Sequence, residues 1–289
     1  GYGTVFGYSG DYKVQHWFGV LSMGRKKSYI QIGGALLCGA CLAAGLLTGC
    51  GKPTDDGGAK ETKITVGCDD FAPFSYVDGD GNMTGIDVKL GEEAFRRMGY
   101  QAEFRIINWE EKKTLLESGA IDCIWSSFSM DGREEEYRWS GPYMRSHQVV
   151  AVNVDSDIHS LKDLKDKVIA VQSTTKPEEM LRSHHEALPQ LRQVISVQKR
   201  DLIFLMLSKG YVDAIAAHDT GIRQFMSESG LEFRILEEPL LTVGLGVAFD
   251  KTDPRGLSDQ LNTVLREMYD DGTTERIIGE YFQDTDRYL

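Results

Sequence analysis

Short apolar runs typical of strands alternate with longer segments of helical periodicity from residue 63 onward. We expect strands at residues 63–67, 102–107, 121–126, 149–154, 168–172, 193–197, 212–216, 233–236 and 245–249. We expect helices at residues 87–98, 112–118, 177–185, 202–208 and 257–270, a helical turn at 160–164, and a hairpin of residues 74–77 and 83–86. Because parallel strands need crossover segments, which are usually helices, this alternation predicts an α/β protein with parallel sheets covered by helices on both faces.

The residues before this alternation have the pattern of an export signal. A basic region at 25–27 follows Met23, and a mostly apolar run covers residues 30–47. A transmembrane helix is the alternative, although the run is near the lower length limit for spanning. The run ends in Leu47-Thr48-Gly49-Cys50, which resembles the lipobox of bacterial lipoproteins. We therefore expect an upstream, non-native stretch at 1–22, a lipoprotein signal peptide at 23–49, a membrane-anchoring lipid on Cys50, and a flexible tether over 50–61.

The charge and the cysteine count exclude several classes of protein. The chain has 44 Asp and Glu against 32 Lys and Arg, a net charge of −12, whereas a nucleic-acid binder normally carries a basic face. Its 5 cysteines are too few for a disulfide scaffold and lack the paired spacing of a zinc site. Cys68, directly after the expected strand 63–67, and Cys123, in the expected strand 121–126, are either buried free thiols or a disulfide.

Hydroxyl side chains and an arginine follow the expected strand 121–126. Ser126, Ser127 and Ser129 lie at its end, and Arg133 comes four residues after Ser129. Open α/β sheets bind ligands at the carboxyl ends of their strands. A guanidinium suits a carboxylate because its planar fork donates two parallel hydrogen bonds. The pattern indicates a carboxylate site, with a polar turn and a surface arginine as the alternative.

Two further strand ends carry residues of complementary chemistry. Thr174 and Thr175 lie between the strand 168–172 and the next expected helix, whose first turn has free N–H groups that favour an anion. Asp219 follows the strand 212–216, and its carboxylate is suited to an ammonium group. An anion site together with an ammonium site predicts a receptor for an α-amino acid.

Several segments, taken in order, resemble one known family. They are residues 66–74 (VGCDDFAPF), 85–88 (GIDV), 118–122 (SGAID), 140–143 (SGPY), 160–168 (SLKDLKDKV), 271–273 (DGT) and 281–282 (YF). Over residues 62–289 the chain is similar to the amino-acid-binding family of bacterial ABC-transporter solute-binding proteins. The resemblance implies the two-lobed type II periplasmic-binding-protein fold, with two doubly wound sheets joined by a two-strand hinge that closes on a ligand. Lobe 1 would be residues 62–150 and 246–289, lobe 2 residues 151–245, and the hinge strands 149–153 and 242–247.

The resemblance also implies the roles of individual side chains. Phe71 and Trp109 would cover the ligand from opposite sides, Ser127 and Ser129 would bond its α-groups, and Ser126 would line the pocket. Arg133, helped by Thr174 and Thr175, would grip the α-carboxylate.

The ammonium site departs from the family spacing. His218 stands where the family has its acidic residue, and Asp219 comes one residue later. We favour Asp219, restored by a bulge, because a carboxylate neutralises an ammonium, and His218 is the alternative. The spacing from Ser129 to Arg133 is also one residue shorter than usual, which requires a tighter turn. Asp69 or Asp70 would either receive a cationic ligand side chain or cap a local turn.

We therefore expect an extracytoplasmic, lipid-anchored binding protein, not an enzyme, that delivers an amino acid to the permease of an ABC importer. It would act as a monomer, without cofactor, metal or nucleic acid. One alternative is an extracytoplasmic dehydratase-type enzyme on the same fold, with His218 as its acid or base. The other is a sensor component that presents its ligand to a receptor.

Overall fold

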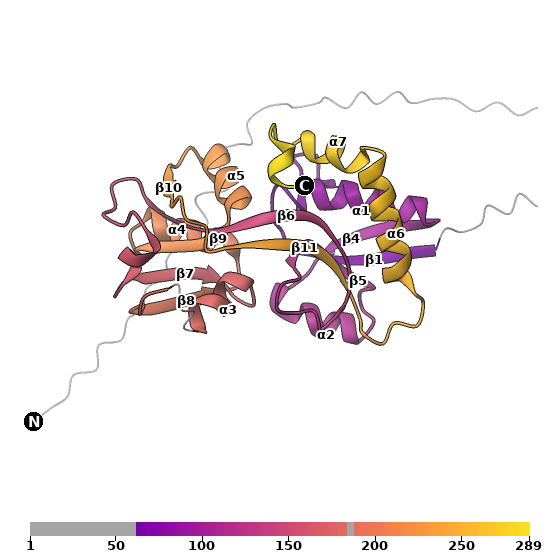
Figure 1. Ribbon diagram of the computed structural model, residues 1–289, viewed down its shortest axis with the longest axis horizontal. Helices are drawn as coiled ribbons and strands as arrows, with labels where there is room; N and C mark the ends of the chain where they lie inside the picture. The colour runs from indigo at the N-terminus through magenta and orange to yellow at the C-terminus, as the bar shows by residue number, and fades with distance from the viewer. Residues whose placement is uncertain (1–61, 184–187) are drawn as a thin grey trace, which may run out of the picture. The chain divides into compact units, whose positions relative to one another are not determined.

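The computed structural model describes residues 62–183 and 188–289 (Figure 1). The predicted upstream stretch, signal peptide, lipidated Cys50 and tether lie outside these residues, as do residues 184 and 185 of the predicted helix 177–185. Among the described residues, no helix is both long and apolar enough to cross a membrane.

Nine strands of the described chain form one sheet. Eight of them follow the order β4-β1-β5-β11-β6-β9-β7-β8, and β10 pairs with β6. The strands are β1 (Thr62–Cys68), β4 (Tyr100–Ile106), β5 (Cys123–Ser129), β6 (Arg138–Asn153), β7 (Val168–Gln172), β8 (Gln193–Val197), β9 (Ala214–His218), β10 (Phe233–Ile235) and β11 (Leu241–Phe249). The short strands β2 (Tyr76–Val77) and β3 (Met83–Thr84) form the separate, expected hairpin.

Two long antiparallel strands, β6 and β11, join two bodies of the fold (Figure 1). Their register runs from Arg138 opposite Phe249 to Gln148 opposite Leu241. Beyond this point β6 pairs with β9, starting at Gln148 opposite His218. Because one strand belongs to both bodies, its middle residues lie between them.

The first body, lobe 1, contains the parallel strands β4, β1 and β5. Its helices are α1 (Ile86–Arg97), α2 (Lys112–Glu117), α6 (Leu257–Asp270) and α7 (Thr273–Gly279), with a 3-10 turn η2 at Trp109–Glu111 and another, η4, at Thr285–Arg287. Side chains of α1, α6 and α7 pack with the sheet in one hydrophobic core. Side chains of α2 and η2 pack with β5 in a second, smaller core. All seven residues of β5 are buried, as expected for a central strand.

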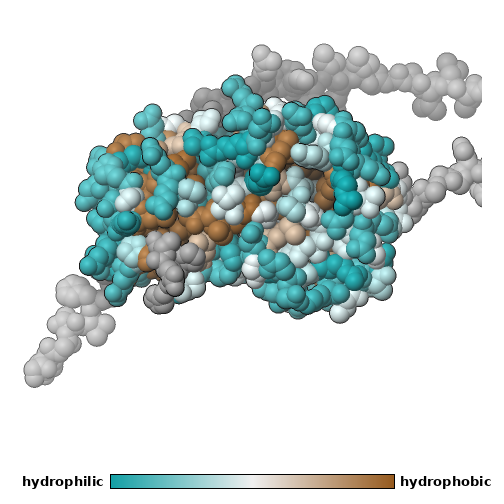
Figure 2. Space-filling model, viewed as in Figure 1, coloured by the Kyte–Doolittle hydropathy of each residue, from teal (hydrophilic) through white to brown (hydrophobic). Residues whose placement is uncertain are grey.

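The second body, lobe 2, contains the parallel strands β9, β7 and β8. Its helices are α3 (Lys176–Arg182), α4 (Arg200–Ser208) and α5 (Asp219–Ser229), with the 3-10 turn η3 at Leu161–Leu164. Side chains of α3 and η3 pack in one core, and those of α4 and α5 in another. Figure 2 shows apolar side chains gathered on lobe 2, at the left, whereas the visible surface of lobe 1 is mainly hydrophilic.

Each expected strand and helix has a counterpart in the structure, at bounds that differ by a few residues in most cases. The structure also contains elements that were not expected, among them helices α5 and α7 and the first part of β6. The boundary between the hydrophobic cores of the two lobes also differs by a few residues from the expected lobe boundaries. Val243 and Leu245, expected in lobe 2, pack in the core of lobe 1, whereas Val149 and Val150 pack in lobe 2. Cys68 and Cys123 are buried free thiols, which resolves the alternative left open by the sequence.

Candidate ligand-binding site

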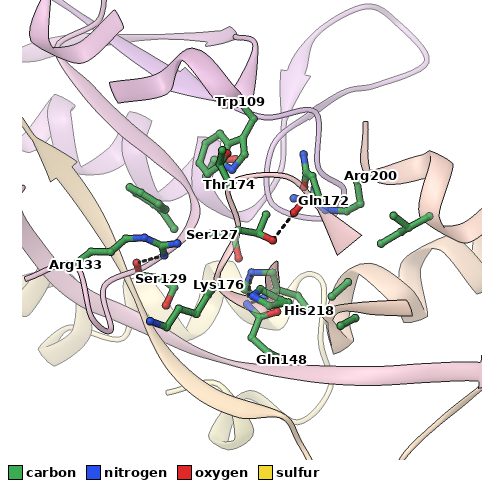
Figure 3. A pocket seen from close by; sticks show the side chains of 17 residues that line it. Trp109, Ser127, Ser129, Arg133, Gln148, Gln172, Thr174, Lys176, Arg200 and His218 are labelled. Atoms are coloured by element: carbon green, nitrogen blue, oxygen red, sulfur yellow. Dashed lines mark hydrogen bonds between the residues drawn. The ribbon is translucent and has the colours of Figure 1, made fainter. Parts of the chain in front are cut away.

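A pocket lies between the two lobes, beside the strands that join them (Figure 3). It has an empty volume of about 470 Å³, part of it open to solvent. Lobe 1 supplies residues from β5, η2 and the turn after β5, and lobe 2 supplies residues from β7, β9, α3 and α4. The lining residues are Trp109, Ser126, Ser127, Phe128, Ser129, Arg133, Gln148, Gln172, Thr174, Thr175, Lys176, Pro177, Arg200, Ile203, Ala216, Ala217 and His218.

The end of β5 brings the predicted serines to the pocket through an irregular strand. Ser127 has a φ of 48°, and the pairing of β5 with β11 shifts register at this point. A bulge of this kind re-aims side chains next to functional sites. The fully buried carboxylate of Asp87 accepts a hydrogen bond of 2.6 Å from the backbone N–H of Ser127 and thereby holds this conformation.

Arg133 reaches the pocket from the turn after β5. Its Nη1 donates to the carbonyl of Ser129 at 3.2 Å, and its guanidinium lies 5.3 Å from the ring centre of Phe128. Trp109 packs edge-on against the same ring, with 5.4 Å between centroids. The aromatic cluster thus supports the arginine from one side, and Nη2 lies 3.5 Å from the carboxylate of Glu179 in lobe 2.

The turn between β7 and α3 brings Thr174, Thr175 and Lys176 to the pocket from lobe 2. Thr174 also has a positive φ, of 56°, and its N–H donates to Glu178 at 2.6 Å. The buried Lys112 of lobe 1 donates through Nζ to the Thr174 hydroxyl at 2.8 Å. Burial, followed by the charge of Arg133, lowers the pKa of Lys112 to about 8.

His218, and not Asp219, lines the pocket at the end of β9. Its Nδ1 lies 2.6 Å from the Ser146 hydroxyl, and its Nε2 lies 2.9 Å from the amide nitrogen of Gln148. Burial, with a smaller effect of Arg200, lowers the pKa of His218 to about 3, so the ring is neutral at neutral pH. A residue so weakly basic is unsuited to general acid or base work near pH 7, which weighs against the dehydratase-type alternative.

Asp219 differs from its expected place. It begins helix α5, it is fully buried, and it does not line the pocket. Its carboxylate accepts a hydrogen bond from Arg287 at 3.1 Å and lies 4.0 Å from Arg223. No bulge turns it toward the ligand site, because β9 ends at His218 and the helix starts directly afterwards.

Phe71 also differs from its expected role, since its ring is not among the pocket-lining groups. The guanidinium of Arg200 lies 3.4 Å from the centre of that ring and covers it. Arg200 Nη2 is paired with Asp69 at 3.1 Å, and the Gln172 amide donates to Asp69 at 2.8 Å. The Asp69 carboxylate is therefore bonded to Arg200 and Gln172 of lobe 2. It does more than cap a local turn, and it is not free to receive a cationic ligand side chain.

Buried polar atoms without a partner gather around this pocket. They are Trp109 Nε1, Ser127 Oγ, Ser129 Oγ, Gln148 Oε1, Gln172 Oε1 and Arg200 Nη1. Buried polar groups in native proteins are nearly always hydrogen-bonded, and an exception calls for a ligand, ion or water. Among the described residues, no group of three or more His, Cys, Asp or Glu side chains is arranged to hold a metal ion.

Of the predicted site residues, Trp109, Ser126, Ser127, Ser129, Arg133, Thr174 and Thr175 line the pocket together. Sequence reasoning missed Gln148, Gln172, Lys176 and Arg200. Gln172 and Lys176 flank the predicted turn of Thr174 and Thr175. Because polar residues beside a strand end indicate a ligand site, both could have been predicted from the sequence. Gln148 and Arg200 carry no such signal, because each lies inside or at the start of an ordinary strand or helix.

A family model of bacterial extracellular solute-binding proteins, family 3, matches residues 64–284. The chain belongs to this family. The glutamate-binding protein GluB of Corynebacterium glutamicum is 28% identical over 279 residues, which cover 89% of this chain and 92% of the relative. The arginine-binding extracellular protein ArtP of Bacillus subtilis is 29% identical over 252 residues, covering 86% and 96%.

Solved structures show the same fold. The protein in the crystal structure of a mutant of ArgBP from T. maritima is 29% identical, has a TM-score of 0.68, and matches over 76% of this chain and 95% of its own. The predicted family and two-lobed type II fold are thus confirmed, with the sheets of the two lobes joined into one through β6. These relatives are named as binding proteins, in agreement with the prediction that this solute-binding protein is not an enzyme.

Proposed function

We propose that this family 3 solute-binding protein captures an amino acid between its lobes and delivers it to an ABC importer. In this proposal the chain is a monomer held outside the cytoplasm at the cell membrane by a lipid on Cys50. The relatives named for binding glutamate and arginine support the amino-acid class and leave the side chain open.

The observation that carries the proposal is the set of unpartnered, buried polar atoms around one pocket between two lobes. A bound ligand satisfies these atoms and contacts both lobes at once, so it stabilises the closed arrangement. Arg133 provides the charge for an α-carboxylate, and the hydroxyls of Ser129, Thr174 and Thr175 provide further donors. The unpaired amide oxygens of Gln148 and Gln172 provide neutral acceptors for the ammonium.

A ligand screen tests the amino-acid class. The full chain, purified in mild detergent and refolded from denaturant to remove retained ligand, is heated with each of the twenty amino acids, cystine and ornithine. A ligand at about 100 times its Kd adds roughly 2.7 kcal/mol, which raises the Tm of a chain of this size by roughly 5–10 °C. A shift with one chemical class supports the proposal, and no shift with any amino acid contradicts it.

The role of Arg133 is tested by Arg133→Ala. Removing one partner of a buried charge pair costs about 2–5 kcal/mol, so we expect the Kd for the identified ligand to rise by about 30-fold or more. The matched control is Arg96→Ala, because the Arg96 side chain on α1 is 69% exposed and does not line the pocket. Calorimetric titration gives both values, and unchanged affinity in Arg133→Ala would show that the carboxylate binds elsewhere.

A further inference from the structure

We propose that the pocket selects a ligand with two carboxylates, a small dicarboxylate such as an acidic amino acid, and that Arg200 holds its second carboxylate. This inference rests on the proposed function, because it names the ligand class of the same pocket. It goes beyond the family resemblance, which predicts one arginine for the α-carboxylate and leaves the side-chain site open.

The first observation is the excess of positive charge in the pocket. Arg133, Lys176 and Arg200 line it with side chains only 10–11% exposed, and none of its described lining residues carries a carboxylate. The buried ammonium of Lys112 contacts Thr174 at the pocket wall.

The carboxylates that contact these cations are only two among the described residues. Glu179 lies 2.7 Å from Lys176 and 3.5 Å from Arg133, and Asp69 lies 3.1 Å from Arg200. Four cations against two carboxylates leave two positive charges without a contacting anion. Asp70 and Asp201 act on Arg200 from beyond contact distance, and Glu110 and Glu136 act in the same way on Lys112, but none of these carboxylates lines the pocket. Because little-exposed cations without a contacting anion are costly, an anionic ligand is stabilised in the pocket and a cationic one is disfavoured.

The second observation is that the acceptor for a cationic side chain is already occupied. Asp69 is one of the two carboxylates, with Asp70, that the sequence offers for a basic ligand, and Phe71 is the aromatic face beside it. Arg200 pairs with Asp69 and stacks on Phe71, and Gln172 donates to the same carboxylate. The protein thus places its own guanidinium where a cationic ligand side chain would bind.

The third observation is the free donor of this guanidinium. Arg200 Nη1 is buried and has no hydrogen-bond partner, although Nη2 is paired. Figure 3 shows Arg133 and Arg200 on opposite sides of the pocket. Lys176 belongs to the Arg133 side, because both contact Glu179. A ligand with a carboxylate at each end matches these two cationic ends, and a ligand with one carboxylate leaves Arg200 Nη1 unpaired.

Calorimetric titration of the refolded full chain tests the ligand class. The probes are L-glutamate and L-aspartate, glutarate and succinate, L-glutamine and L-asparagine, and L-arginine and L-lysine. Glutamine and asparagine are nearly isosteric with the acidic amino acids and differ in charge. We expect at least one dicarboxylate to bind about 30-fold or more tightly than its amide counterpart and the basic amino acids. This factor corresponds to the loss of one buried charge pair between the ligand and the protein.

Each outcome separates this inference from the proposed function. Tightest binding of an amide or a basic amino acid overturns the dicarboxylate inference and leaves the proposed function intact. Binding of glutarate or succinate, but of no amino acid, supports the dicarboxylate inference and overturns the amino-acid proposal. Binding of none of the eight probes overturns the dicarboxylate inference, and the wider screen described above then decides the proposed function.

Arg200→Gln tests the assigned residue. It removes the second cationic end and leaves Asp69 without its arginine, so we expect dicarboxylate affinity to fall about 30-fold or more and binding of L-arginine or L-lysine to appear. A merely structural role of Arg200 would weaken binding without this change of class. The control is Arg192→Gln in the same lobe, whose side chain is 65% exposed and outside the pocket.

Asp69→Asn provides a second test of the Arg200 assignment if circular dichroism shows that Arg200→Gln does not fold. It removes the charge that neutralises Arg200 while keeping an oxygen acceptor, so we expect unchanged or tighter dicarboxylate binding. Two results would overturn the assignment of Arg200. One is that folded Arg200→Gln binds the dicarboxylate as tightly as the unmodified chain. The other is that Asp69→Asn loses dicarboxylate affinity by more than about tenfold, 1.4 kcal/mol.

Discussion

Two residues other than glycine adopt positive φ angles at the pocket, one from each lobe. Ser127 and Thr174 have φ values of 48° and 56°. This conformation costs an L-residue roughly 1–2 kcal/mol. Such strain persists where the surroundings enforce it and gathers at ligand sites. Here the Asp87 carboxylate fixes the Ser127 N–H, and Glu178 fixes that of Thr174. The fold thereby holds two hydroxyl residues ready for a ligand.

A pair of variants at Ser127 separates its backbone from its hydroxyl. Both Ser127→Gly and Ser127→Ala lose the unpartnered Oγ, so we expect ligand affinity to fall about fivefold to tenfold in each, the loss of one hydrogen bond. Only glycine relieves the positive φ, so its free energy of unfolding should exceed that of the alanine variant by about 1 kcal/mol. Chemical denaturation measures this difference, and a more stable alanine variant would contradict the strain.

His218 and Asp219 are adjacent in sequence but have separate roles. His218→Ala removes the ring that contacts the Gln148 amide in the pocket, so we expect ligand affinity to fall about tenfold, the value of one or two hydrogen bonds. Asp219→Ala removes the partner of Arg287 away from the pocket, so we expect the free energy of unfolding to fall by about 1–3 kcal/mol with ligand affinity little changed. Titration calorimetry and denaturation measure the two quantities. If folded Asp219→Ala lost ligand binding, the Asp219 carboxylate would bind the ammonium group of the ligand after all.

At the scale of elements, Asp87 ties one helix to two strands. It lies in the first turn of α1 and accepts hydrogen bonds from the Ser127 N–H of β5 and, at 2.7 Å, from the Tyr143 hydroxyl of β6. Burial raises the pKa of this carboxyl to about 7, although the two hydrogen bonds oppose the rise. The helix thus positions the strand end that carries the serines.

This raised pKa predicts how stability depends on pH. The folded state holds the proton more tightly than the unfolded chain, so the contribution of Asp87 is fully present below about pH 4 and is lost as pH rises through about 7. In Asp87→Asn we expect the free energy of unfolding to fall less steeply between pH 5 and 8, by a few kcal/mol at most. Urea denaturation across this range measures it, with exposed Asp270→Asn as control. Equal pH slopes in all three proteins would contradict the raised pKa.

At the scale of the whole folded body, contacts between the lobes surround the pocket. Lys112 donates from lobe 1 to the backbone and hydroxyl of Thr174 in lobe 2, and Gln198 donates from lobe 2 to Glu110. Gly221 lets α5 approach the Phe71 ring, because a Cβ at this position would lie 2.5 Å from it. These contacts stabilise the closed arrangement, and ligand binding is coupled to them.

Lys112→Met tests this coupling, because methionine keeps the length of the buried chain and removes the Nζ donor. We expect ligand affinity to fall about tenfold, as for one or two lost hydrogen bonds, and the ligand-free radius of gyration in small-angle X-ray scattering to increase. The neighbouring Lys113→Met is the control, since that side chain is 49% exposed and pairs with Glu136 within lobe 1. Unchanged affinity and radius in Lys112→Met would show that this contact does not hold the lobes together.

Local sequence patterns were sufficient to predict the family, the α/β fold and the strand ends whose hydroxyls line the pocket. Residues such as Ser127, Thr174 and Arg133 are found from local order, because a strand end in an open α/β sheet has a defined position relative to its ligand crevice. Helix α6 and strands β7 and β8 also have the predicted bounds, since periodicity is a local property of the chain.

The charge of the pocket, in contrast, follows from tertiary packing. Arg200 and Gln148 are ordinary residues of a helix and a strand until packing brings them to the gap between the lobes. The passage from β9 into α5 decided between His218 and Asp219, because one residue along the chain changes the direction of a side chain. Which side chains meet across two lobes depends on how the lobes pack, and local sequence periodicity carries no information about that contact.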